Sequence, residues 1–115
     1  MSPLMASAQA KILADHNWRV FINAADVTQP VEVRVTSTKA VAVSVMTMDD
    51  LARLDKRELD DLSKTLAIST PNTEHKLVPV IPANTAWAVV VFNLSETDSP
   101  DVKLEVQSTG SRSFA

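Results

Sequence analysis

Two runs of alternating valine constrain the fold of this chain more than any other feature. Valine occupies every second position in 31–35 and again in 41–45. Successive side chains of a β-strand point to opposite faces, so this period of two predicts two strands. Polar residues alternate with the first valines, which indicates one buried face. Small or apolar residues alternate with the second, which indicates a more central strand, and the polar spacer 37–39 predicts a hairpin between the two.

Other short runs extend this β-rich pattern. The run 87–93 is apolar on both faces and is expected at the centre of a sheet. Pro79 lacks the backbone N–H that a sheet ladder uses, so the run around it is expected at an edge or a bulge. The expected strands are 11–14 and 18–23 (two short strands or one long strand), 31–36, 41–46, 76–81, 87–93 and 102–107.

The hydrophobic period changes after Thr47. Thr47 and Asp50 have the spacing of a helix capping box, with aspartate in place of glutamate. Leucines then recur at near-helical spacing. We therefore expect a helical insertion at about 48–66, as one bent helix or two short ones, closed by Pro71 and Asn72.

The number and spacing of these runs predict a single all-β domain. A length of 115 residues matches one domain. Six or seven short strands separated by turn residues are typical of a mainly antiparallel β-sandwich, here with one short helical insertion. The single glycine, Gly110, lies near the end of the sequence, so Asn, Asp, Ser and Pro are expected to form the turns. We expect residues 1–115 to form this domain, with frayed tails at 1–10 and 108–115.

Composition excludes several classes of function. The chain has no cysteine, which excludes disulfides, thiolate metal sites and a cysteine nucleophile, and its one glycine is too few for a glycine-rich phosphate loop. A net charge of −3 with scattered basic residues is the wrong pattern for nucleic acid. The longest apolar run, 86–92, is far shorter than the roughly 20 residues that span a bilayer. We expect no cofactor, no nucleic acid and no membrane as partner, and a cytoplasmic location because 1–10 lacks the pattern of a secretory signal.

Residues that perform catalysis or hold metals are sparse. The only histidines are His16 and His75, and a triad needs a group that orients its base. Asp15 and His16 would point apart at a strand break, so we expect both histidines on surface loops. The acidic residues of 49–61 lack the spacing and the glycine of a calcium loop, and they interleave with basic residues as on a solvated helix. We expect no catalytic residue and no metal site.

The apolar side of the helical insertion is the candidate interface. Such a side either covers one end or an open face of the sandwich, or it contacts a partner or a second copy of the chain. Methionine at its start adapts to irregular partners. The candidate interface residues are Met48, Leu51, Leu54, Leu59, Leu62 and Leu66.

Large aromatic side chains provide a candidate ligand pocket. Trp18, Trp87 and Phe92 lie on expected strands and would line such a pocket. The alternative is that the tryptophans belong to the core, as is usual on sandwich strands.

The order of several segments resembles a known bacterial family. A Trp–Val–Phe strand leads into Asp26 and the valine repeats, followed by Val-Met-Thr-Met-Asp-Asp-Leu at 45–51, Val-Ile-Pro at 80–82 and Trp-Ala-Val-Val-Val at 87–91. This order is similar to small bacterial β-sandwiches of unassigned function, some joined to Toll/interleukin-receptor-type domains. It is more distantly similar to GOLD and pre-peptidase C-terminal sandwiches. The resemblance covers 18–107 and implies a binding or adaptor module, with no functional residues carried over.

These observations favour a non-enzymatic protein-binding or adaptor module that acts through its helical insertion or a sheet edge. Two alternatives remain open at this point. One is a structural subunit of a homo-oligomeric assembly, from a phage or a bacterium. The other is a sandwich that senses a small ligand. In the first two cases the expected partner is a protein or another copy of this chain.

Overall fold

A computed structural model describes residues 4–58, 62 and 65–108 of the chain. In these residues seven strands and one α-helix follow one another, and every pair of hydrogen-bonded strands is antiparallel. The elements are β1 (Leu4–Lys11), β2 (Asn17–Ile22), β3 (Gln29–Thr47), α1 (Met48–Asp55), β4 (Ala67–Leu77), β5 (Val80–Ile81), β6 (Trp87–Phe92) and β7 (Asp101–Ser108).

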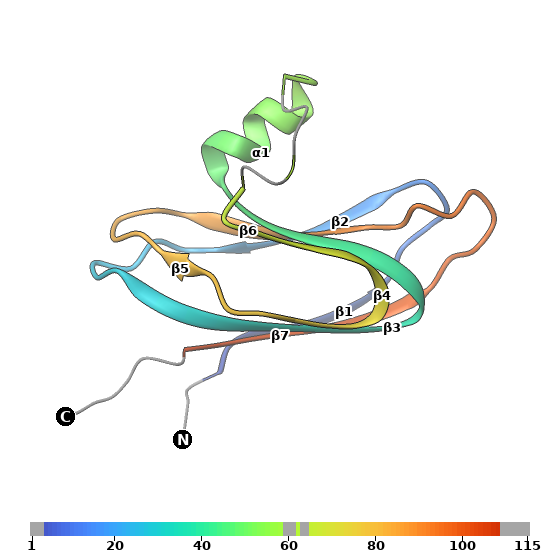
Figure 1. Ribbon diagram of the computed structural model, residues 1–115, viewed down its shortest axis with the longest axis horizontal. Helices are drawn as coiled ribbons and strands as arrows, with labels where there is room; N and C mark the ends of the chain where they lie inside the picture. Colours follow the sequence, from blue (N-terminus) through green and yellow to red (C-terminus); the bar gives the residue numbers. More distant parts are fainter. Residues whose placement is uncertain (1–3, 59–61, 63–64, 109–115) are drawn as a thin grey trace.

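The strands form two layers that share β3 and β4 (Figure 1). The first half of β3 pairs with β7, and its second half pairs with β6. Strand β4 follows the other side of β3 through both halves. The first layer therefore has the order β1-β7-β3-β4 and the second layer the order β2-β6-β3-β4. This arrangement confirms the expected class, a mainly antiparallel β-sandwich with six to seven strands and one short helix.

The expected hairpin between 31–36 and 41–46 was wrong. Both valine runs belong to the continuous 19-residue strand β3, and the polar spacer is the place where this strand crosses from the first layer to the second. Thr36 of β3 lies opposite Glu74 of β4. Val41, five residues further along β3, lies opposite Asn72, which is only two residues from Glu74. Several residues of β3 thus bulge opposite Thr73, and such bulges bend a strand sharply. Odd-numbered valines face inward on both sides of the bend, so the period of two continues without a reversal of the chain.

The expected frayed tail at 1–10 was also wrong for the residues that are described. Strand β1 begins at Leu4 and pairs with β7 as far as Lys11, where a separate strand at 11–14 was expected to begin. Its alanines alternate with polar residues but bury little apolar area, so its strand conformation depends on pairing with β7. Residues 1–3 and most of the expected tail at 108–115 lie outside the described part, and Ser108 ends β7.

Pro71 and Asn72 do not close the helical segment, because both lie inside β4. Within the described residues, β4 pairs only with β3, and an edge strand tolerates a residue that lacks an N–H. The register also shifts here, since Val41 lies opposite Asn72 and Val43 lies opposite Ser69. Pro71 is thus in a bulge, where no ladder hydrogen bond is lost.

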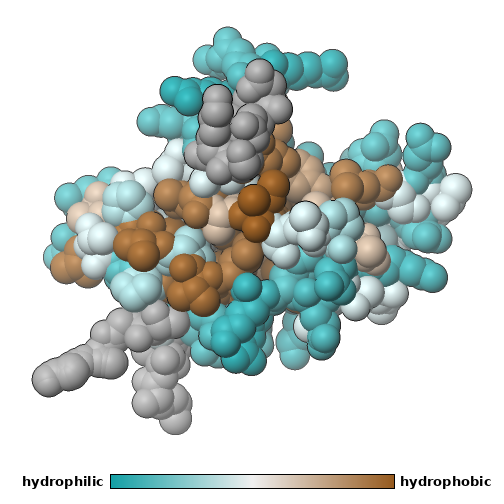
Figure 2. Space-filling model, viewed as in Figure 1, coloured by the Kyte–Doolittle hydropathy of each residue, from teal (hydrophilic) through white to brown (hydrophobic). Residues whose placement is uncertain are grey.

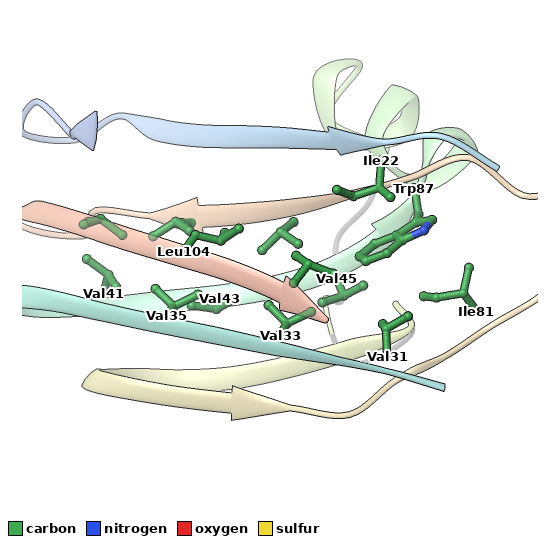
Figure 3. Packing of buried hydrophobic residues seen from close by; sticks show 14 of the residues in the cluster. Ile22, Val31, Val33, Val35, Val41, Val43, Val45, Ile81, Trp87 and Leu104 are labelled. Atoms are coloured by element: carbon green, nitrogen blue, oxygen red, sulfur yellow. The ribbon is translucent and has the colours of Figure 1, made fainter. Parts of the chain in front are cut away.

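The main core fills the space between the two layers (Figure 3). Inward side chains from β3, β6 and β7 meet there with Ile81 of β5, and each fully buried valine contributes roughly 1.5–3 kcal/mol to stability. The members are Ile12, Ile22, Val31, Val33, Val35, Val41, Val43, Val45, Ile81, Trp87, Val89, Val91, Val102, Leu104 and Val106.

Helix α1 starts where the sequence predicts. Thr47 caps it, because its side-chain oxygen accepts a hydrogen bond from the Asp50 N–H at 3.2 Å. The helix ends at Asp55, and Arg57 adopts a positive φ of 60° in the turn that follows. Of the rest of the expected insertion, 59–61 and 63–64 lie outside the described residues. In the part of the chain that is described, no helix has the length and apolar character to cross a membrane.

Candidate functional site

The helical segment lies on the outer face of the second layer (Figure 1). Leu51 is buried there against Met46 of β3 and against Ala88 and Val90 of β6, which point away from the main core. Leu54, Leu62 and Phe92 are partly buried against the same cluster. The outer face is apolar, so α1 covers a surface that would otherwise be exposed to water.

Polar contacts attach the helical segment to the sheet on both sides. The Arg19 guanidinium of β2 donates two hydrogen bonds to the Asp55 carboxylate, at 3.0 Å (Nη1–Oδ2) and 2.5 Å (Nη2–Oδ1). These hydrogen bonds lower the pKa of Asp55 and raise the pKa of Arg19, and the charge attraction acts in the same direction. On the other side, Thr65 Oγ1 lies 3.0 Å from the buried Ser44 Oγ and donates to the Leu62 carbonyl oxygen at 2.6 Å.

The candidate interface residues therefore separate into different environments. Leu51, Leu54 and Leu62 contact the chain's own sheet, whereas Leu66 packs against the main core. Met48 remains 38% exposed at the start of α1, and Leu59 lies outside the described residues. A contact between these residues and a partner stays a prediction, which now concerns Met48 and Leu66 more than the buried leucines.

The candidate pocket residues do not converge. Trp87 is buried in the main core, and Trp18 of β2 is partly buried against the same core. Phe92 lies on the opposite face of β6, in the cluster beneath α1. Neither of the two grooves described next is lined by these three residues.

Two open grooves lie on the first layer. The larger, of about 520 Å³, is lined by residues at the end of β1, at the bend in the middle of β3 and at the start of β7, and the smaller, of about 370 Å³, by residues of β3 and β4. Several of the charges around them are paired. Lys11 and Asp101 lie 3.6 Å apart, and Glu32 accepts a hydrogen bond from Arg34 at 2.6 Å and faces Lys76 at 3.4 Å. The hydrogen bond from Arg34, chiefly, lowers the pKa of Glu32.

His75 is not on a surface loop, as was expected, but is buried in β4. Its Nε2 lies 2.9 Å from the Asn72 carbonyl oxygen, which only accepts hydrogen bonds, so Nε2 carries the proton. Nδ1 then accepts from the Ser69 hydroxyl at 2.6 Å. This serine–histidine pair spans the bulge at Pro71 and connects the two arms of β4. Among the described residues, no group of three or more histidine, aspartate or glutamate side chains is placed to hold a metal ion.

Exposed aliphatic side chains gather on the side of the sandwich formed by β4 and β5. Ile68, Val78 and Val80 are 43%, 54% and 57% exposed, and Leu66 and Leu77 are partly buried between them and the main core. Figure 2 shows apolar surface extending from below the helix toward β5. We call these five residues the β4–β5 side.

Sequence reasoning found only part of the β4–β5 side. It assigned Leu66 to the helical insertion and missed Ile68, because β4 was not expected to begin before Pro71. A recognisable sign was present around Pro79. Val78 and Val80 alternate with inward-facing Leu77 and Ile81, so this edge segment is apolar on both faces although one face meets solvent.

Comparison with known proteins gives the fold. No protein-family model and no curated protein matches the chain. The crystal structure of a mitogen derived from Yersinia pseudotuberculosis is similar, with a TM-score of 0.64 at 8% identity over 98% of this chain and 92% of that chain. At this identity the likeness shows the fold alone. Neither this structure nor the two described next is titled as one of the sandwich families that the sequence resembles, so that resemblance stays a prediction.

Two weaker similarities lie below the level that supports an argument. A de novo designed double-stranded β-helix matches with a TM-score of 0.46 at 10% identity, over 90% of this chain and 97% of that one. The carbohydrate-binding module CBM36, in complex with calcium and xylotriose, matches with a TM-score of 0.40 at 11% identity, over 92% of this chain and 91% of that one.

Proposed function

We propose that this protein is a non-enzymatic protein-binding module and that the β4–β5 side is its binding surface. The observation that carries the proposal is the gathering of Ile68, Val78 and Val80, all substantially exposed, on an edge of the sheet. Exposed aliphatic patches of this kind mark interaction surfaces. Of the two routes that the sequence suggests, the helical insertion packs most of its apolar side on the chain itself, and the sheet edge remains accessible.

The surroundings of the β4–β5 side indicate how a partner would be recognised. The charged side chains nearest to it on the first layer, Glu32, Arg34 and Lys76, form ion pairs with one another. Glu32 neutralises one of the two cations, so these three side chains leave a net charge of only +1 beside the β4–β5 side. The partner is therefore a protein that presents aliphatic or aromatic side chains, and its affinity depends weakly on salt.

Site-specific cross-linking tests this proposal. A photoreactive phenylalanine replaces Val80 in one variant and Leu94 in a matched control, since Leu94 is 62% exposed in a loop outside the β4–β5 side. A protein cross-linked at position 80 and not at position 94 is then purified, and its affinity for the chain is measured by calorimetry. We expect Val80→Asp to weaken this affinity at least tenfold, through the loss of about 1.4 kcal/mol, and Leu94→Asp to change it less than twofold.

Two outcomes would overturn the proposal. In one, cross-linking at position 80 yields no protein that is absent at position 94. In the other, the purified partner binds Val80→Asp as tightly as it binds the unchanged chain. Thermal unfolding of both variants checks that the substitutions leave the fold intact, as expected for exposed positions.

A further inference from the structure

The free edge of β1 lies at the other end of the first layer from β4. Strand β1 pairs with β7 from Leu4 to Lys11 with a bulge at Met5, and no strand in the described part of the chain pairs with its other side. An edge strand presents backbone N–H and C=O groups that are available to another strand.

The other two edges of the sandwich carry features that hinder strand addition. Strand β4 contains Pro71 and the charged residues Glu74 and Lys76. Strand β2 carries Arg19, which is held by Asp55 of α1. Charges, prolines and covering elements are the usual protections of edge strands.

Strand β1 has no charge, proline or covering element over residues 4–10, and its one bulge, at Met5, lies outside the regularly paired stretch from Ala6 to Lys11. Its only charge is Lys11, at the end of the strand and 3.6 Å from Asp101 of β7. A run of seven uncharged residues without proline is an edge that accepts another strand.

The side chains of β1 also allow close approach of a second sandwich. Ala6, Ala8 and Ala10 point inward, opposite Val106, Leu104 and Val102 of β7, and all three alanines are only partly buried. Ser7 and Gln9 point outward and are exposed. Because the inward side chains of β1 are small alanines, the cores of two sandwiches can approach each other closely at this edge. A neighbouring strand would bury the apolar surface of these alanines that is still exposed.

We propose that β1 pairs antiparallel with β1 of a second copy of this chain across a twofold axis at Ala8. In this register Ala6 lies opposite Ala10 and Ser7 lies opposite Gln9, so each face meets a matching face. The two Lys11 residues lie at opposite ends of the seam, and no like charges face each other. A twofold antiparallel pairing is self-complementary, which favours a second copy over an unrelated strand. The two first layers then form one continuous sheet of eight strands.

This proposal concerns a surface separate from the β4–β5 side and does not depend on the proposed function. Sedimentation velocity of the full chain over a range of concentrations measures the dimer. The double variant Ser7→Lys/Gln9→Lys places lysine opposite lysine twice across the axis. Like charges at facing positions destabilise a strand pair, so we expect the dissociation constant to rise about tenfold. The control Thr70→Lys/Thr73→Lys adds the same charge at exposed positions of β4 and should leave it unchanged.

A second measurement tests the register. The chain has no native cysteine, so Ala8→Cys introduces one thiol that lies opposite its symmetry mate. Facing residues of an antiparallel pair have Cα atoms about 4.5–5.5 Å apart, within the range of a disulfide. Mild oxidation should convert Ala8→Cys to a covalent dimer at least tenfold faster than Thr70→Cys.

Each contrary result would overturn the inference. If the chain stays monomeric over a 100-fold range of concentration, the proposed dimer does not form. A dimer that the lysine pair does not weaken uses another surface. Equal oxidation rates for Ala8→Cys and Thr70→Cys exclude the proposed register. Val80→Asp should leave the dimer intact, so failure of this inference and failure of the proposed function are distinguishable.

Discussion

At the scale of single residues, three buried polar side chains hold loops and bulges in one arrangement. Asn93 donates to the carbonyl oxygens of Ile12 and Leu13, both at 3.1 Å, and of Asp98 at 2.7 Å, and so joins the loop after β1 to the loop after β6. Ser44 and His75 are likewise hydrogen-bonded to neighbouring side chains. A buried polar group without a partner costs on the order of 1–3 kcal/mol, so these contacts specify one arrangement of the loops and bulges.

The Arg19–Asp55 pair makes a residue-scale prediction about pH. The hydrogen bonds from Arg19 lower the pKa of Asp55 in the folded state. Protonation of Asp55 therefore removes stability, which is fully present above the unfolded-state pKa of about 4 and is lost as the pH falls through the lowered folded-state value. We expect the urea midpoints of the unchanged chain and of Asp55→Asn to differ at pH 7 and to converge as the pH falls through that lowered folded-state value. A difference that stays the same throughout the acid range would show that the ion pair does not hold α1 in solution.

At the scale of elements, sequence patterns predicted what depends on local alternation. The inward valines of β3, the two-faced run of β6 and the alternation in β7 were all recognised, because period-two burial is local. Strand β1 was missed, since its inward residues are alanines, which bury little apolar area, and only the pairing with β7 makes them a strand. The first part of β4 was missed because Pro71 and Asn72 are typical of a turn, and only the register shift against β3 shows that a bulge accommodates them.

The candidate site was predictable to a similar extent. The apolar side of the helical insertion was identified, but its direction depends on the sheet beneath it. The outer face of the second layer is apolar because it carries Met46, Ala88 and Val90. The leucines of the insertion pack on this face and are therefore less available to a partner. The two-faced apolar character of 41–46 and 87–93 was the sequence feature that required such a cover.

A pair of substitutions within α1 tests where its apolar side points. Leu51 is buried against β3 and β6, so Leu51→Ala should lower the free energy of unfolding by about 2–4 kcal/mol. Met48 is exposed three residues earlier on the same helix, and Met48→Ala should change it by less than about 0.5 kcal/mol. Urea unfolding of both variants measures these values. Similar small losses for both would mean that the helix does not rest on the sheet.

At the scale of the whole molecule, the two proposed surfaces occupy opposite ends of one layer. Joining two first layers through β1 leaves a β4–β5 side at each outer end of an eight-stranded sheet. With about 4.8 Å between strands, these two sides lie roughly 34 Å apart. The dimer therefore presents two binding surfaces at a fixed separation, and it would favour partners that are themselves arranged as repeats or on a surface.

This geometry makes a prediction about avidity. Two linked sites bind a dense array of partners much more tightly than either binds alone, often by a factor of 10² or more. The variant Ser7→Lys/Gln9→Lys should bind a sparse surface of the identified partner with unchanged affinity and should lose at least tenfold in apparent affinity on a dense surface. Surface plasmon resonance at two partner densities measures both values. An equal loss at both densities would indicate that β1 contacts the partner directly, because only a bivalent dimer makes the affinity depend on density.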